Sequence, residues 1–242
     1  MRGQLQSPVG VPRGIGISAY LCEIYMRSFD EQIKAMPHVL FYARYVDDII
    51  IVAYKPVIGT ALKLFSGIKD TISKYKLSRN KDKTHCYSVD GTKAYKMDFL
   101  GYTISFGQGT IKFNWTQEKL DRYKSRIDLT INAYLKNSKS NEKKARNIFL
   151  KRARFLTSNT RLHNNKRNSV VGIYFSNTLL TEMNDLVGLD FYYQAKLNQI
   201  SNASVKAKAA MLSFKDAFET KLFSNFSEKE LAEIVKAWKN AA

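Results

Sequence analysis

The feature that most constrains this chain is a pair of adjacent aspartates, Asp47 and Asp48, between two apolar runs. Residues 41–46 precede the pair and residues 49–52 follow it, and both runs are rich in aromatic or β-branched side chains. Such side chains favour strands, and an acidic pair between two strands favours a tight turn. The pattern therefore predicts a β-hairpin with both carboxylates at or near its tip.

Two neighbouring carboxylates repel each other, so on a rigid turn they raise each other's pKa or bind a cation. Mg²⁺, held by one or two carboxylates and substrate phosphates, fits that arrangement. A solvated Asp-Asp turn is the plain alternative, and for these two residues alone it is the better interpretation. Three isoleucines at 49–51 change the balance, because they predict a second strand buried on both faces, where charge without a function is costly.

The charge balance indicates a polyanionic partner. The 242 residues include 39 Lys and Arg but 21 Asp and Glu, which gives a formal net charge of +18. Nucleic acid is the commonest partner for such a surplus. No apolar run is long enough to span a bilayer and no signal peptide is visible, so we expect no membrane association and a cytoplasmic protein. Cys22 and Cys86 predict reduced thiols rather than a disulfide framework.

The first half of the chain predicts a mixture of helices and strands. Besides the hairpin, the expected elements are a Gly- and Pro-rich loop at 8–16, helices at 18–35 and 57–75, a polar loop at 77–87 that leads into a short strand, and strands at 97–106 and 110–113. The last two strands flank Gly107-Gln108-Gly109 as a hairpin. Because helices and strands do not alternate strictly, we expect an α+β fold.

The second half predicts helices alone. Thr116 is an expected N-cap for a helix at 117–135, a second helix is expected at 142–155, and Ser227 with Glu230 predicts a capping box for a last helix. Basic helices with interleaved aromatic residues are typical of a nucleic-acid cradle. For most individual residues here, the better interpretation is that the aromatic side chains form the core and the charged side chains face solvent.

Lys83 and the glycine-rich loop have two interpretations each. A lysine near a phosphate site can donate a proton, but a solvated lysine is equally expected in so basic a chain. A Gly-rich loop before a helix lets the backbone approach a phosphorylated ligand, whereas an ordinary glycine-bearing turn is the better interpretation of this loop alone.

The order of these motifs resembles the palm of reverse transcriptases. Gly-Val-Pro-Arg-Gly-Ile-Gly-Ile-Ser is followed by Tyr-Val-Asp-Asp in a hairpin, a helix, a Lys-Thr pair and Phe-Leu-Gly-Tyr. The series is most similar to the bacterial lineages, namely group II intron, retron and defence-associated antiviral reverse transcriptases. The resemblance covers about residues 7–113. It implies a palm at 1–113, an antiparallel sheet with helices on one face, and an all-α, thumb-like region at 114–242.

The resemblance also implies roles for individual residues. Asp47 and Asp48 would be the catalytic, metal-binding acids, Tyr45 would pack under the primer end, and Lys83 would be the general acid for pyrophosphate. Pro12, Arg13, Gly14 and Gly16 would contact template and nucleotide, although most relatives carry glutamine where Arg13 stands. The primer grip would be Phe99, Leu100, Gly101 and Tyr102.

The implied chemistry is nucleotidyl transfer onto a primer by two Mg²⁺ ions. The implied partners are an RNA template, a DNA or RNA–DNA duplex and a dNTP. The family's third aspartate lies upstream of the glycine-rich loop, and the first six residues here contain no acid. We therefore expect a fragment, a subunit completed by an N-terminal half or a partner polymerase subunit, or a degenerate palm, and no polymerase activity from this chain alone.

Two other classes of function compete with this interpretation. A non-catalytic nucleic-acid-binding subunit with a palm shape would also explain the charge and the motif series. A basic structural or ribosome-associated protein would leave the ordered motifs unexplained. The family likeness further implies a role in bacterial antiviral defence.

Overall fold

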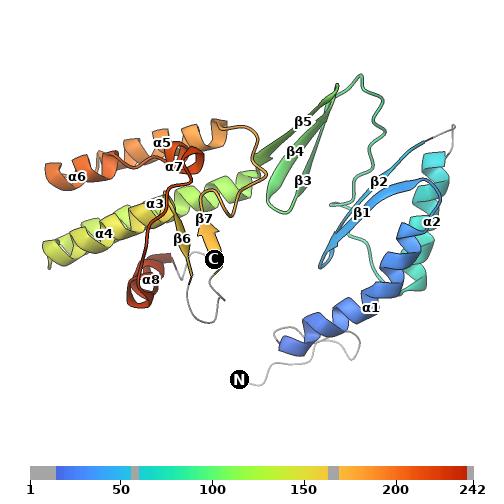
Figure 1. Cartoon of the computed structure of the whole chain (residues 1–242), viewed down its shortest axis with the longest axis horizontal. Coiled ribbons are helices and arrows are strands. Elements are labelled where there is room, and N and C mark those ends of the chain that lie inside the picture. The colour runs from blue at the N-terminus through green and yellow to red at the C-terminus, as the bar shows by residue number, and fades with distance from the viewer. Residues whose placement is uncertain (1–14, 56–59, 163–168, 239–242) are drawn as a thin grey trace. The chain divides into compact units, whose positions relative to one another are not determined.

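The computed structural model describes residues 15–55, 60–162 and 169–238 (Figure 1). Contacts within the chain divide it into two compact units, Met1–Val89 and Asp90–Ala242, and each is described by itself. The mixed α+β class with antiparallel sheets and a helical C-terminal region was predicted from the sequence and is confirmed. The predicted palm–thumb boundary at 113/114 concerns functional domains and stays a prediction.

The described residues of the first unit form two helices and one hairpin, namely α1 (Gly16–Lys34), β1 (Val39–Tyr45), β2 (Asp48–Ala53) and α2 (Thr60–Lys74). The strands are antiparallel, with Ala43 opposite Ile50 and Tyr45 opposite Asp48. The C-terminal half of α1 anchors the unit, because Phe29 and Ile33 are fully buried there. The Phe29 ring meets the Tyr75 ring edge-on, with centroids 5.8 Å apart.

Two expectations for this unit are wrong. Ile49–Ile51 are half-buried and Val52 is exposed, so β2 is not buried on both faces. The reason is that the β1–β2 sheet has two strands, and a two-stranded sheet covers its own residues poorly. The short strand expected after Lys83 is also absent, because residues 84–90 have no regular structure.

The second unit begins with a three-stranded antiparallel meander, β3 (Tyr95–Phe99), β4 (Tyr102–Gly107) and β5 (Thr110–Trp115). The prediction of one strand over residues 97–106 is wrong, since a turn at Leu100 and Gly101 divides it. Both turn residues have positive φ, 49° and 77°, which is the geometry of a type I′ turn. The expected hairpin at Gly107-Gln108-Gly109 is present.

Helices form the rest of the second unit, together with a short β6–β7 hairpin (Figure 1). They are α3 (Gln117–Ser138), α4 (Glu142–Leu156), α5 (Asn184–Leu197), α6 (Ala203–Ala210), α7 (Phe214–Glu219), α8 (Glu228–Val235) and a final 3₁₀ turn (Lys236–Trp238); β6 is Asn159–Arg161 and β7 is Val170–Gly172. Thr116 caps α3 and the Ser227–Glu230 capping box starts α8, as the sequence predicted. Every helix in the described residues is too short or too polar to cross a membrane.

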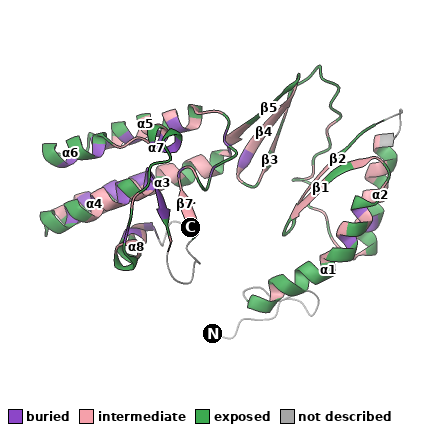
Figure 2. Cartoon of the chain, viewed as in Figure 1, coloured by how far each residue is buried: buried purple, intermediate pink, exposed green. Residues whose placement is uncertain are grey.

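The main core lies between α3, α4 and α5 (Figure 2). Ile127, Phe149 and Leu189 are almost completely buried there. Arg152 is also buried, and its guanidinium donates to the carbonyls of Ile234 and Glu233, each at 3.0 Å. This arginine therefore satisfies backbone acceptors at the C-terminal end of α8.

Candidate active site

The acidic pair lies at the turn of the β1–β2 hairpin, as the sequence predicted. Tyr45 and Asp48 face each other as the last strand pair, so Val46 and Asp47 are the two turn residues. Both carboxylates are exposed to solvent, and so is Tyr45. The fold thus presents one acidic side chain on the two-residue turn and a second on the first residue of β2.

Val46 holds this turn in an unfavourable backbone conformation. Its φ is 58°, whereas Asp47 keeps a negative φ. Positive φ at the first of two turn residues is the pattern of a type II′ turn, where glycine is usual. A β-branched residue in that position costs about 1–3 kcal/mol, and such strain persists where the surrounding structure enforces it.

Replacing Val46 with glycine should relieve this strain. Glycine loses about 0.5–1 kcal/mol through the entropy of the unfolded chain, so we expect a net gain of about 1 kcal/mol in the free energy of unfolding. Urea denaturation of the variant measures this change. Val52→Gly is the matched control, because Val52 is an exposed valine of the same hairpin without positive φ, and it should lose stability. Equal losses in both variants would contradict the assignment of strain.

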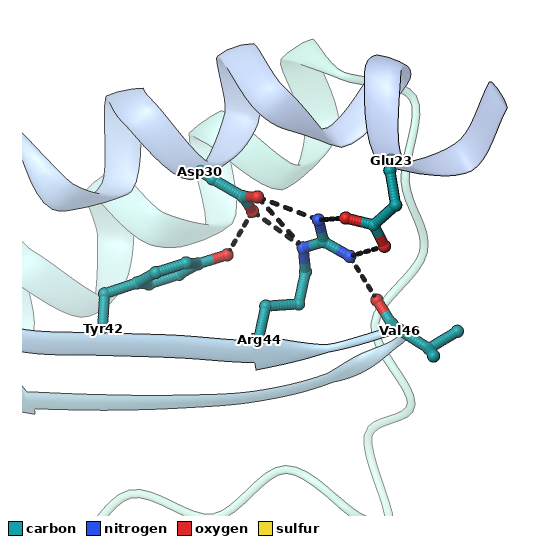
Figure 3. A network of polar contacts seen from close by, with 5 residues as sticks. All are labelled: Glu23, Asp30, Tyr42, Arg44 and Val46. Carbon is teal, nitrogen blue, oxygen red and sulfur yellow. Dashed lines mark hydrogen bonds and ion pairs between the residues drawn. The ribbon is translucent and has the colours of Figure 1, made fainter. Parts of the chain in front are cut away.

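Arg44, on β1, connects this turn to helix α1 (Figure 3). Its Nη1 donates to the Val46 carbonyl at 2.9 Å and to Glu23 Oε1 at 3.0 Å. Its Nη2 donates to Glu23 Oε2 at 2.7 Å and to Asp30 Oδ2 at 2.9 Å. Its Nε donates to both oxygens of Asp30, at 2.9 Å and 3.2 Å. A single guanidinium therefore contacts two carboxylates of α1 and one carbonyl of the turn.

Charge and burial reinforce this network. The Arg44 side chain is 6% exposed, and hydrogen bonds to Glu23 and then Asp30 raise its pKa above the ordinary value. Burial pushes the pKa of Asp30 upward, but hydrogen bonds from Arg44 and Tyr42 outweigh it and leave that pKa lowered. Burial and the 2.5 Å hydrogen bond to Asp30 raise the pKa of the Tyr42 hydroxyl. All of these groups therefore keep their charge state near neutral pH.

Sequence reasoning did not identify Glu23 and Asp30. One signal was present, because residues seven apart lie on the same face of a helix. Their partner on β1 could not be inferred from that spacing.

The donor set at the turn is suitable for Mg²⁺ in its chemistry. Asp47 and Asp48 offer carboxylate oxygens, the ligands that hard divalent cations prefer. Within the described residues, no group of three or more His, Cys, Asp or Glu side chains is placed to hold a metal ion. Among the described residues, the turn therefore offers two carboxylates without a third potential metal ligand beside them.

Comparison with known families identifies the segment that carries this turn. Residues 3–104 match the family described as reverse transcriptase (RNA-dependent DNA polymerase). This segment is therefore similar to reverse transcriptase domains. No curated protein and no solved structure matches the chain.

The matched range includes every residue to which the sequence assigned a functional role. Gly16 is the first residue of α1, whereas Pro12, Arg13 and Gly14 lie outside the described residues. Lys83 is exposed in a turn at 81–83, where its backbone N–H donates to Asn80 Oδ1 at 3.2 Å. The structure therefore places Lys83 in the same compact unit as the acidic turn.

The predicted primer grip forms the β3–β4 turn in the second unit. Leu100 is exposed at this turn, whereas Tyr102 is buried. Lys119, in the first turn of α3, lies with its Nζ 4.3 Å from the centre of the Tyr102 ring and 5.6 Å from that of Trp115. Sequence reasoning did not identify Lys119, since nothing in its spacing separates it from the other lysines of this chain.

Burial lowers the pKa of Lys119 from 10.5 to about 8, and the charge of Arg122 adds to this effect. The unfolded chain therefore holds more protons than the folded chain between about pH 8 and 10.5, and stability from this group rises with pH across that window. Lys119→Met should raise the melting temperature at pH 7, with a smaller gain at pH 10. Lys143→Met, an exposed control on α4, should change it little at either pH. Equal gains from Lys119→Met at both pH values would contradict the desolvation cost.

Proposed function

We propose that this chain is the palm and thumb part of an RNA-directed DNA polymerase that transfers nucleotides onto a primer end. The match to the reverse transcriptase family supports nucleotidyl transfer, with an RNA template and nucleotide substrates as the general partners of that family. The observation that carries the proposal is the strained turn that presents Asp47 and Asp48 inside the matched segment. In phosphoryl transfer, positioned carboxylates and metal ions do most of the chemical work.

Each predicted residue has a role in this proposal. Asp47 would hold the Mg²⁺ ions with Asp48 beside it, while Tyr45 would pack under the primer end. Lys83 donates a proton to the departing pyrophosphate. The turn residues Leu100 and Gly101, with Phe99 and Tyr102, support the primer strand. Pro12, Arg13, Gly14 and Gly16 contact the template and the incoming nucleotide. Mg²⁺ would stabilise the charge that develops on the attacking and departing oxygens.

A two-metal reaction needs a further carboxylate besides this turn. Glu23 and Asp30 belong to the same compact unit, but both hold the Arg44 guanidinium. We propose that the third acid is supplied by polypeptide outside these 242 residues, either an N-terminal half or a partner polymerase subunit. The chain by itself is then inactive.

Primer extension tests the proposal directly. The assay uses an RNA template, a DNA primer, dNTPs and Mg²⁺, with the chain alone and with the polypeptide encoded immediately upstream of Met1. We expect extension in the combined preparation and none from the chain alone. Extension by the chain alone would contradict the need for a further acid. A combined preparation that binds hybrid duplex but never extends the primer would favour the alternative, a non-catalytic nucleic-acid-binding subunit.

We further propose that the protein acts in the cytoplasm of a bacterium in antiviral defence. The likeness of its motif series to defence-associated reverse transcriptases supports this proposal. Expression of the intact locus should lower the plating efficiency of an infecting phage, and Asp47→Asn should restore it. Equal plating with and without the locus, across a panel of phages, would count against this role.

A further inference from the structure

Arg44 uses its whole hydrogen-bonding capacity inside the protein. A guanidinium has five N–H donors. The single N–H of Nε is shared between the two oxygens of Asp30. The two N–H groups of Nη1 donate to Glu23 and to the Val46 carbonyl, and the two of Nη2 donate to Glu23 and to Asp30 Oδ2. The side chain is 6% exposed. Arg44 therefore has no donor left to bind a phosphate or a base, so its contribution is made through the residues that it holds.

The acceptor in the turn is the carbonyl of the strained residue itself. Val46 has a φ of 58°, and its carbonyl belongs to the peptide bond that leads into Asp47. A hydrogen bond at that carbonyl, 2.9 Å from Arg44 Nη1, fixes the orientation of the peptide plane before the first acid. Strained backbone persists where neighbouring groups enforce it, and this bond is one such restraint.

The other end of the restraint is held by a rigid element. Glu23 and Asp30 belong to the 19-residue helix α1 and grip the guanidinium from two sides (Figure 3). Arginine–carboxylate pairs with two parallel hydrogen bonds fix geometry as well as charge. Tyr42, next but one before Arg44 on β1, donates to Asp30 and holds that carboxylate in place.

We propose that Arg44 is a positioning residue. It fixes the Val46–Asp47 peptide relative to helix α1, and in this way it also positions the side chains of Asp47 and Asp48. The expected effect on Mg²⁺ dependence rests on the proposed function. The expected effect on the backbone of the turn does not. Loss of the guanidinium would free the Val46 carbonyl and let the turn leave its strained conformation. The acids would then occupy the metal-binding geometry for a smaller fraction of the time.

The test measures backbone motion in the 242-residue chain by ¹⁵N relaxation. In the wild type, the order parameters of Val46, Asp47 and Asp48 should be near the rigid value of about 0.85. In Arg44→Lys, which keeps the charge but loses the planar fork, they should fall below about 0.6, with the centre of the hairpin unchanged. Glu23→Gln should give a smaller fall, and it should fold because Glu23 is the exposed member of the network.

Tyr42→Phe is the matched control. It removes one hydrogen bond of the same network, the one to Asp30, but leaves Arg44 bonded to Val46. A role in general stability alone would make Tyr42→Phe and Arg44→Lys alike at the turn. Order parameters at Val46–Asp48 that stay at the wild-type value in both Arg44→Lys and Glu23→Gln would overturn the proposal.

A second readout separates this inference from the proposed function. In the chain combined with the upstream polypeptide, Arg44→Lys should raise the Mg²⁺ concentration for half-maximal extension about tenfold. This is the low end of the effect of removing a residue that supports a metal ligand. The affinity for hybrid duplex should stay unchanged. Extension that survives Asp47→Asn would defeat the proposed function. Extension abolished by Asp47→Asn but with wild-type Mg²⁺ dependence in Arg44→Lys would defeat the positioning role alone.

Discussion

Replacing Asp47 with asparagine should lower kcat for RNA-templated primer extension by more than about 100-fold, measured with the chain combined with the upstream polypeptide. Loss of residues that merely support a metal ligand costs about 10–100-fold, so loss of a ligand should cost more. The affinity for hybrid duplex should change little, because one exposed carboxylate contributes little to binding a polyanion. Single-turnover extension with saturating dNTP measures the rate, and duplex binding is measured in parallel.

Asp82→Asn is the matched control for this prediction. Asp82 is also an exposed aspartate in a turn of the first unit, so the same charge is removed from the same unit. We expect wild-type kcat from Asp82→Asn. Similar kcat values for Asp47→Asn, Asp82→Asn and the wild type would remove the catalytic role of the acidic turn.

The second large effect is the salt dependence of nucleic-acid binding. The net charge of +18 predicts that phosphate contacts supply most of the affinity for an RNA–DNA hybrid. With six or more such contacts, raising salt from about 50 mM to about 200 mM should weaken binding about 10³-fold or more. Fluorescence anisotropy of a labelled hybrid across that salt range gives the slope of log Kd against log salt.

An RNA paired with a peptide nucleic acid is the control ligand, because one of its two strands carries no phosphates. It should bind more weakly and show a shallower slope, since fewer counterions are released. A slope near zero for the natural hybrid would mean that the excess Lys and Arg side chains do not contact the phosphates of nucleic acid.

Local chemistry made parts of this fold predictable from the sequence. Strand-forming residues on both sides of Asp47 and Asp48 place the turn correctly. The caps at Thr116 and Ser227 are also correct, because a hydroxyl that satisfies free N–H groups acts within one turn of helix. These features depend on neighbours in the sequence, so the sequence is enough to find them.

Other parts depend on backbone conformations that the residue types do not announce. The β3–β4 turn places Leu100 at positive φ, a conformation that a leucine rarely adopts, so a continuous strand was the natural expectation. The same holds for Val46, whose strain is visible only in the structure. Gly101 is the one permissive residue in its turn, and it is a weak signal in isolation.

The rest depends on contacts between distant segments. The Arg44 network joins α1 to β1, and Arg44 lies 14 residues from Asp30 and 21 residues from Glu23 in the sequence. Lys119 differs from other lysines because Tyr102 and Trp115 surround it, and both contacts come from the sheet that precedes α3. Burial of β2 was overestimated because strand composition does not reveal how many strands a sheet contains.

The central claim is that the Asp47–Asp48 turn holds a divalent metal ion where a nucleotide joins a primer. Line broadening by Mn²⁺ tests it most directly, in ¹⁵N spectra of the 242-residue chain with a hybrid duplex and an incoming nucleotide. We expect the amide signals of Val46, Asp47 and Asp48 to broaden at lower Mn²⁺ than that of Asp70, an exposed aspartate on α2, and we expect Asp47→Asn to remove this difference. Broadening that is no stronger at the turn than at Asp70 in the wild-type chain would contradict the proposed metal site.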